Sequence, residues 1–133
     1  MIRTVNDAAS AAYDDYLALH DSRWSYAAPA NGIANTTTAV TIKTAAGAGL
    51  RNIITGMQIS SGPLGAATEV VIRDGAGGTV LWRGWKPATA AVISINFQTP
   101  LRGSADTLLE VATLTATVTG GVYVNVQGYV HEH

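Results

Sequence analysis

The sequence contains no cysteine, and this absence excludes several classes of protein at once. Without thiols there is no disulfide scaffold, no thiolate metal site and no cysteine nucleophile. The 133 residues are enough for one compact domain and too few for two with proper cores. Stability must therefore come from packing or oligomerisation, which is compatible with folding in a reducing cytoplasm.

Charge is also scarce. Only 13% of the residues are charged, about half of the usual share in soluble domains, whereas 47% are apolar. Sixteen threonines and fourteen glycines, with many asparagines and serines, take the place of the missing charges. Such a surface is easily desolvated against a neighbour, and charged side chains are depleted at the centres of interfaces. The composition therefore indicates a protein that works inside an assembly.

The chain has neither a strong net charge nor a long apolar run. Its formal net charge is −1, so it lacks the basic footprint of proteins that bind nucleic acid or anionic membranes. No apolar run approaches the roughly 20 residues that span a bilayer, and no secretory signal pattern begins the sequence. We expect no nucleic-acid partner, no membrane partner and synthesis in the cytoplasm.

Residues 1–23 are predicted to form a short helical arm. Asn6 stands where an N-cap is expected, and apolar residues follow at the i, i+3, i+4 spacing of one helix face. A helix this short is marginal alone in water, so its apolar face should have a partner, either its own domain or another subunit. The arm is acidic, with Asp7, Asp14, Asp15 and Asp21. The candidate interface residues on the arm are Val5, Ala9, Ala12, Tyr13, Tyr16 and Leu17.

Residues 24–133 are predicted to form one antiparallel β-sandwich. After a loop or extended connection at 26–37, apolar and polar residues alternate with a period of two. This alternation is typical of half-buried antiparallel sheets, and no helical pattern follows residue 24. The strand candidates lie at 40–43, 53–59, 70–73, 80–83, 93–97, 107–119 and 122–130. Their spacing and the turn residues between them indicate a sandwich or a barrel.

For two of these strands the alternation predicts which side chains share a face of the sheet. Ile53, Met57 and Ile59 are expected on one face, with Ile54, Gly56 and Gln58 on the other. Val80 and Trp82 are expected on one face, with Leu81 and Arg83 on the other.

No constellation of residues points to catalysis, a metal or a cofactor. Glu69 and Glu110 are the strand carboxylates that could act as a pair, but each is equally explained as an exposed residue paired with an arginine. His131 and His133 offer only two ligands on a chain terminus, which makes a poor metal site. We therefore expect a protein that is not an enzyme and has no cofactor.

The tryptophans are the most informative aromatic residues. Trp82 and Trp85 fall on opposite faces of one strand, so at least one should leave the core unless a bulge intervenes. An exposed Trp85 beside Arg83 would suit an interface anchor, and Trp24 is a further candidate. The same side chains, with Tyr129, would also suit a sugar-stacking platform. Burial of both strand tryptophans in the core or at an edge is the third possibility.

The stretch from Trp24 to Val130 resembles small virion proteins of tailed bacteriophages, of the head-decoration or capsid-associated kind. The residues that carry the resemblance are the strand-and-turn blocks at 53–60, 67–75, 100–104 and 122–129. The resemblance implies a jelly-roll-like sandwich, a homotrimer, and binding to the major capsid protein or other virion subunits at multiple sites. It implies that the protein is located in the virion, which is assembled in the host cytoplasm. It implies no catalytic residue for this sequence.

Three functional hypotheses follow. The leading one is a non-catalytic bacteriophage virion protein, a capsid decoration or cementing protein that oligomerises and binds the shell through many modest contacts. The alternative is a carbohydrate-binding or receptor-binding module of a head fibre or tail. The third is a β-sandwich enzyme, which would need carboxylates that meet in a cleft, drawn from Glu69, Asp74, Asp106 and Glu110.

Overall fold

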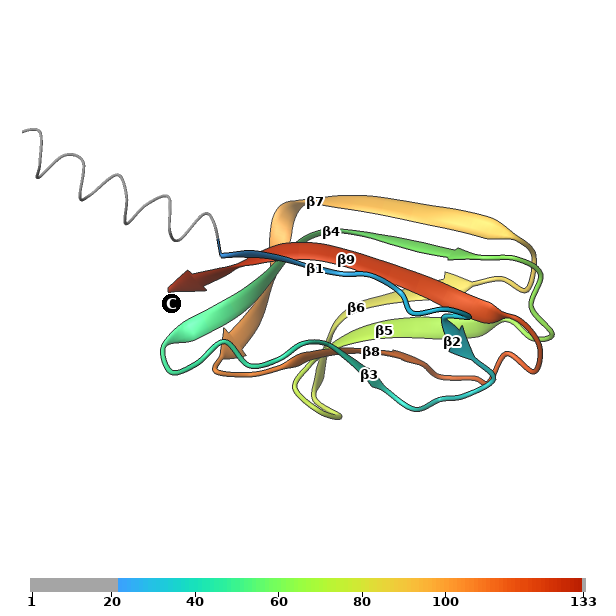
Figure 1. Ribbon diagram of the computed structural model, residues 1–133, viewed down its shortest axis with the longest axis horizontal. Coiled ribbons are helices and arrows are strands. Elements are labelled where there is room, and N and C mark those ends of the chain that lie inside the picture. The colour runs from blue at the N-terminus through green and yellow to red at the C-terminus, as the bar shows by residue number, and fades with distance from the viewer. Residues whose placement is uncertain (1–21, 133) are drawn as a thin grey trace, which may run out of the picture.

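The computed structural model describes residues 22–132, which form two antiparallel sheets (Figure 1). The first sheet has the strand order β1-β9-β4-β7, with β2 also paired to β9, and the second has the order β3-β8-β5-β6. Within these residues all regular secondary structure is β-strand, and there is no helix long and apolar enough to cross a membrane. The strands are β1 (Arg23–Tyr26), β2 (Ile33–Ala34), β3 (Val40–Lys43), β4 (Leu50–Ser61), β5 (Thr68–Asp74), β6 (Thr79–Lys86), β7 (Ala91–Ala105), β8 (Leu109–Thr113) and β9 (Gly121–Glu132).

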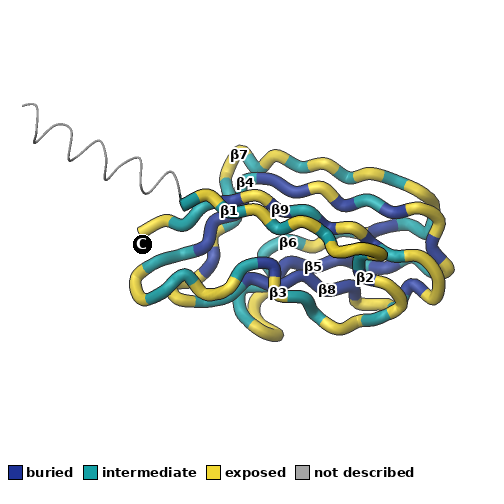
Figure 2. The backbone as a smooth tube through the Cα atoms, in the orientation of Figure 1, coloured by how far each residue is buried: buried dark blue, intermediate teal, exposed yellow. Residues whose placement is uncertain are grey.

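One apolar core lies between the two sheets. Its buried members come from both sheets and form a single cluster, which confirms the predicted sandwich. Burial is almost continuous along β5 and β8, whereas β7 alternates between half-buried and exposed residues (Figure 2). The core residues are Ile33, Ile42, Ile54, Met57, Ile59, Leu64, Val70, Ile72, Leu109, Val111, Val122, Val124 and Val126.

Most of the predicted strands are confirmed, and the differences lie at the ends of the pattern. The run at 107–119 contains only the short strand β8, and the connection predicted at 26–37 contains β2. Strand β1 begins at Arg23. The helix predicted for the arm lies outside the described residues.

The predicted facing of Ile53 and Ile54 is wrong, because β4 contains a bulge. Ile54 is opposite Gly128 on β9 and Gly56 is opposite Gln127, so Thr55 has no partner and the alternation shifts by one residue. Ile54 therefore joins Met57 and Ile59 in the core. Ile53 is buried on the outer side of the first sheet instead, where it lines a pocket.

A second bulge changes the facing of β6. Ile72 is opposite Trp82 and Arg73 is opposite Val80, so Leu81 is the extra residue and packs against the core together with Trp82. The Trp82 ring lies over Gly84, where a Cβ would come within 2.2 Å of it. Trp85 points the other way and is 61% exposed. The prediction that one of the two tryptophans leaves the core is confirmed.

Candidate interaction surfaces

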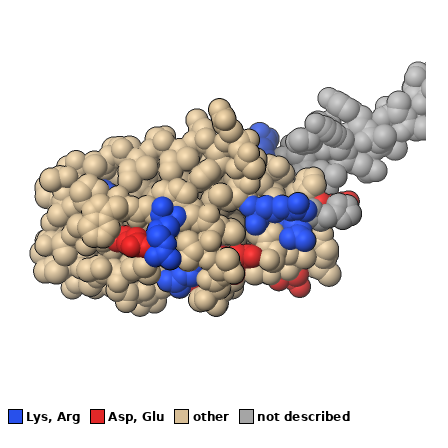
Figure 3. Space-filling model, turned by 180° about the vertical axis from the view of Figure 1, so that it is seen from behind, with Lys and Arg blue, Asp and Glu red and all other residues tan. Residues whose placement is uncertain are grey.

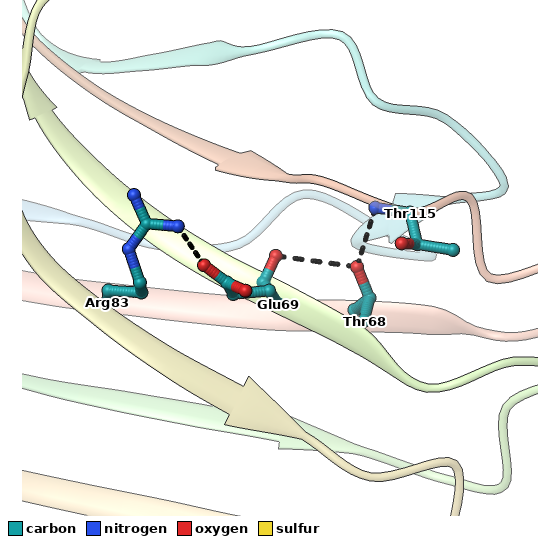
Figure 4. A network of polar contacts seen from close by, with 4 residues as sticks. All are labelled: Thr68, Glu69, Arg83 and Thr115. Atoms are coloured by element: carbon teal, nitrogen blue, oxygen red, sulfur yellow. Dashed lines mark hydrogen bonds and ion pairs between the residues drawn. The ribbon is translucent and has the colours of Figure 1, made fainter.

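The outer face of the second sheet carries an ion pair between neighbouring strands. Arg83 on β6 is opposite Val71 on β5, and its Nη1 donates to the Glu69 carboxylate (Figure 4). Glu69 is opposite Trp85, so the pair lies beside the exposed indole. In the same region the Thr115 amide donates to Thr68 Oγ1 at 3.0 Å, which ties the β8–β9 loop to β5.

A second ion pair covers the middle of this face. Arg73 Nη1 lies 2.9 Å from Glu110 Oε2, and the Gly77 amide donates to the same oxygen at 3.0 Å. Val71 and Ala112, which are opposite each other in the sheet, are fully buried on this side. The acids and bases of this ion-paired face thus satisfy one another and cover the apolar residues between them.

The two candidate catalytic carboxylates do not form one site. Glu110 is opposite Arg73, which is four residues from Glu69 along β5, or about 13 Å at the rise of a strand. Paired carboxylates in glycoside hydrolases are separated by less than about 10 Å. Asp74 instead accepts from the amide and hydroxyl of Ser104. Among residues 22–132, no group of three or more histidines and acids could hold a metal ion.

The outer face of the first sheet is different, because its centre carries uncharged side chains. Strand β4 is flanked by β7 and β9, and the register aligns residues from the three strands in rows. The rows are Asn96, Gly56 and Gln127; Ser94, Gln58 and Asn125; and Val92, Ser60 and Tyr123. We call these nine residues the uncharged face. Figure 3 shows the molecule from behind, where a few groups of basic and acidic atoms stand on a surface that is otherwise made of uncharged residues.

A shallow pocket lies in the uncharged face. Its volume is about 60 Å³, and side chains of two of the rows and Met57 line it. Gly56 leaves this space open, because a Cβ there would lie 3.2 Å from the Asn96 carboxamide oxygen. The pocket is far smaller than the roughly 300–1,000 Å³ of typical small-molecule sites, so it could accept only a small polar group or a few waters. Most of the uncharged face therefore presents exposed or half-buried side chains that can form hydrogen bonds.

Strand β7 forms the edge of this sheet next to the uncharged face. Within the described chain β7 pairs with β4 alone, so the backbone groups on its other side have no strand partner among residues 22–132. Proteins usually protect such edges with charges, proline or very short strands. The other edge strands are short or carry a charge, but β7 has neither charge nor proline from Ala91 to Thr99. Val92 at this edge is 72% exposed.

One end of the same sheet carries basic side chains around an apolar pocket. Arg23, Tyr129, Ile53 and Arg102 align in one row across β1, β9, β4 and β7. A pocket of about 260 Å³ opens here and is lined by the last three with Pro100 and His131. The His131 ring meets Tyr129 edge to face, with ring centres 6.2 Å apart. We call these six residues, Arg23, Ile53, Pro100, Arg102, Tyr129 and His131, the basic patch.

The predicted interface residues have different fates. The six on the arm lie outside the described residues. Trp24 packs against the core, with its ring over Gly128, and its Nε1 has no hydrogen-bond partner in the described chain. Arg83 and Trp85 are both exposed on the ion-paired face. Thus Trp24 has a structural role, and Trp85 is available to a partner.

One lysine is buried at the end of the sandwich. Lys86 is fully buried, and its Nζ donates to the carbonyl oxygens of Pro87 and Thr89, each at 2.8 Å. Desolvation lowers the pKa of this amino group below its ordinary value. Because the two carbonyls belong to the β6–β7 connection, Lys86 holds that loop closed.

The sequence analysis missed the uncharged face and the basic patch. The members of the uncharged face are outward residues of the alternating strands, so the alternation contained a signal for this face: the residues between the apolar ones include Gln, Asn and Ser rather than Lys or Glu. Their assembly into rows depends on strand pairing, which the pattern of one strand does not contain.

Comparisons with known proteins do not assign the chain to a family. No protein-family model matches the chain, and no curated protein matches it. Among solved structures, a chain from the structure of the infectious bursal disease virus Gx strain aligns with 13% sequence identity and a TM-score of 0.30. The alignment covers 81% of this chain and 28% of that chain. A TM-score this low does not establish a shared fold, so it carries no weight for the function.

Proposed function

We propose that the chain is a non-catalytic structural protein of a virion, a subunit that oligomerises and binds a capsid shell. The observation that carries the proposal is the uncharged face together with the open edge of β7. A water-exposed sheet normally carries charges that oppose association, and the three rows of the uncharged face carry none. A neighbouring protein can cover such a surface without desolvating charged groups.

The strand order supports the same proposal at the level of the fold. With β1 and β2 together beside β9, the two sheets have the order of a jelly roll, as in viral capsid and lectin domains. This is an analogy between folds, and the function must come from the surfaces. The particular role we propose is decoration of a bacteriophage head by a homotrimer, in which several modest contacts act together on the shell.

Particle binding tests the proposal. We expect the purified protein to cosediment with capsids of the phage that encodes it, and a Gln58→Lys variant to lose this binding, because a lysine would place a charge at the centre of the uncharged face. The matched control is Thr41→Lys on the ion-paired face. Equal binding by both variants, or failure of the wild type to bind capsids, would contradict the proposal.

The alternative function is a carbohydrate-binding module, and the exposed Trp85 favours it. An indole that is 61% exposed beside an arginine offers a flat apolar surface to a sugar ring. Glycan-array binding that is lost in Trp85→Ala would support this alternative. Retention of capsid binding in the same variant would support the structural role.

A further inference from the structure

We infer that two copies of this chain pair through β7, edge to edge and antiparallel, so that their first sheets become one continuous sheet. The inference rests on the self-association in the proposed function, and it names the strand, the partner and the register. Three observations support it: the chemistry of the edge, the half-buried apolar residues along it, and the direction of its backbone groups.

The edge of β7 lacks the charges that the other edges carry. Among the described residues the two sheets end in β1, β3, β6 and β7, and Figure 1 shows β7 along the rim of the first sheet. Strands β1 and β3 have 4 residues each and include Arg23 and Lys43, and β6 includes Arg83. Strand β7 has neither charge nor proline from Ala91 to Thr99. An uncharged strand of this kind at an edge readily adds another strand.

The core side of this edge is only partly covered. Ile93, Ile95 and Phe97 pack against the core but remain half-buried. Ile59, which is opposite Ile93 on β4, is fully buried by comparison. On the outer side of the sheet Val92 is 72% exposed. A strand placed beside β7 would therefore remove apolar surface from water on both sides of the sheet.

The chemistry and the symmetry of the edge favour a second copy as the partner. Two β7 strands in antiparallel pairing bring no charged residue into the contact. Pairing of β7 with β1, β3 or β6 of another copy would include a charged residue and would leave an edge free at each end, so that further chains could add without limit. The contact between two β7 strands is two-fold, so it uses both edges and closes.

The backbone of β7 defines which residues can bond to the added strand. The carbonyl oxygen of Ile95 lies 3.2 Å from the position that a Cβ on Gly56 would take, so this carbonyl points toward β4. Along an antiparallel ladder the N–H and C=O groups of successive residues point alternately to one side and to the other. Those of Val92, Ser94 and Asn96 therefore point away from β4, toward the partner strand.

The register centred on Ser94 pairs all three of these residues. It places Ser94 opposite its counterpart in the second copy, and Val92 opposite Asn96, as hydrogen-bonded pairs. On the core side the same register places Ile93 opposite Ile95, so apolar residues meet across the contact. Because the pairing uses the backbone of the edge, the side chains of the uncharged face remain available to the shell and to the other contacts of the proposed trimer.

Disulfide trapping tests this register, because the chain has no cysteine of its own. Residues in a hydrogen-bonded antiparallel pair have Cα atoms about 5.5 Å apart, within the range of about 4.4–6.8 Å that a disulfide spans. Under mild oxidation we therefore expect Ser94→Cys to form a covalent dimer. Gln58→Cys is the matched control, since Gln58 is in the same row of the uncharged face but one strand away from the edge. It should give at least about tenfold less dimer, the difference expected for cysteines that are not held together.

Two results of the trapping experiment would overturn the inference. Equal dimer from Ser94→Cys and Gln58→Cys would show that the copies stack through the uncharged face rather than pair at the edge. No disulfide in Ser94→Cys, at concentrations at which the wild type self-associates, would show that the two copies of β7 do not meet in this register.

Charge swapping at the two-fold axis gives a second readout. Ser94→Lys and Ser94→Glu should each weaken self-association on the order of tenfold, because like charges would stand directly opposite each other. Since Ser94 is exposed, both variants should keep the fold. An equal mixture of the two should recover the association as a heterodimer, because opposite charges then meet. Gln58→Lys mixed with Gln58→Glu is the control and should show no such recovery.

The inference and the proposed function fail in different ways. If the mixture of Ser94→Lys and Ser94→Glu does not recover, or if each variant alone self-associates like the wild type, while the wild type binds capsids, the proposed function stands and the inference falls. A wild type that is monomeric and does not bind capsids overturns both.

Discussion

The two outer faces of the sandwich differ in how their polar groups are satisfied. On the ion-paired face, Arg83 binds Glu69 and Arg73 binds Glu110, so the charges meet within one chain and cover Val71 and Ala112. On the uncharged face, Gln58, Ser94 and Asn96 are exposed and present donors and acceptors outward. The polar groups of the ion-paired face are thus satisfied within the single chain, whereas those of the uncharged face would form more contacts with a neighbouring protein.

Removal of Glu110 should have the largest effect on folding. Glu110→Ala leaves Arg73, which is only 21% exposed, and the Gly77 amide without their acceptor. Breaking a buried ion pair from one side costs about 3 kcal/mol in the free energy of unfolding. Urea denaturation would measure this cost.

Glu69→Ala is the matched variant on the same face. Because Arg83 and Glu69 are 54% and 30% exposed, their pair should contribute less than about 1 kcal/mol. Equal losses in the two variants would show that the ion pairs do not differ in burial as described.

Trp24 and Trp85 should also differ in how much each contributes to the free energy of unfolding. Trp24 packs over Gly128 against the core, so Trp24→Ala should lower the free energy of unfolding by about 2 kcal/mol, whereas Trp85→Ala on the surface should change it by less than about 0.5 kcal/mol. Trp24→Phe keeps much of the packing and removes the unpaired indole N–H. It should therefore lose less stability than Trp24→Ala, as thermal unfolding would show; the reverse order would place Trp24 outside the core.

Lys86 should make stability depend on pH. Burial lowers its pKa in the folded state, so the unfolded chain binds more protons between that lowered pKa and the ordinary value of 10.5. The contribution of Lys86 to the free energy of unfolding therefore becomes more favourable as the pH rises through this window.

Comparison with Lys86→Met isolates the effect. Tyr26, whose pKa is raised by burial, is present in both proteins and cancels in the difference. Urea denaturation at a series of pH values should show that the free energy of unfolding of the wild type increases relative to that of Lys86→Met as the pH rises toward 10.5. A difference that is independent of pH would mean that Lys86 is not desolvated.

The smallest effect on folding is expected on the uncharged face. Gln58→Lys should change the free energy of unfolding by less than about 0.5 kcal/mol, because the side chain is exposed and solvent can reach the new charge. Chemical denaturation would check this. A loss above about 2 kcal/mol would show that Gln58 has a structural role within one chain.

The sequence predicted the sandwich because alternation is a local property of each strand. Val122, Val124 and Val126 all face the core, as their spacing indicates. The alternation failed where a bulge adds a residue, at Thr55 and at Leu81. In both places two apolar residues stand side by side, Ile53 with Ile54 and Leu81 with Trp82, which alternation alone does not allow. Adjacent apolar residues accompany both bulges, but they do not identify a bulge by themselves, because Val70, Val71 and Ile72 on β5 are also adjacent and pair with β8 without a shift.

The surfaces could be predicted only in part. The scarcity of charge pointed to an assembly surface, but its position depends on the register between β4, β7 and β9. The basic patch joins Arg23, Arg102 and Tyr129 from three distant parts of the chain, and no local pattern contains that neighbourhood. Strand pairing over long sequence separations is thus the information that the periodicity lacks.

The native mass of the protein over a dilution series tests the central claim most directly, because the claim is that one face of this sandwich needs a neighbour. The wild type should be an oligomer that dissociates on dilution, and a variant with Gln58→Lys and Ser94→Lys should be a folded monomer. A wild type that is monomeric at every concentration, or a variant with the same oligomeric mass, would contradict the account.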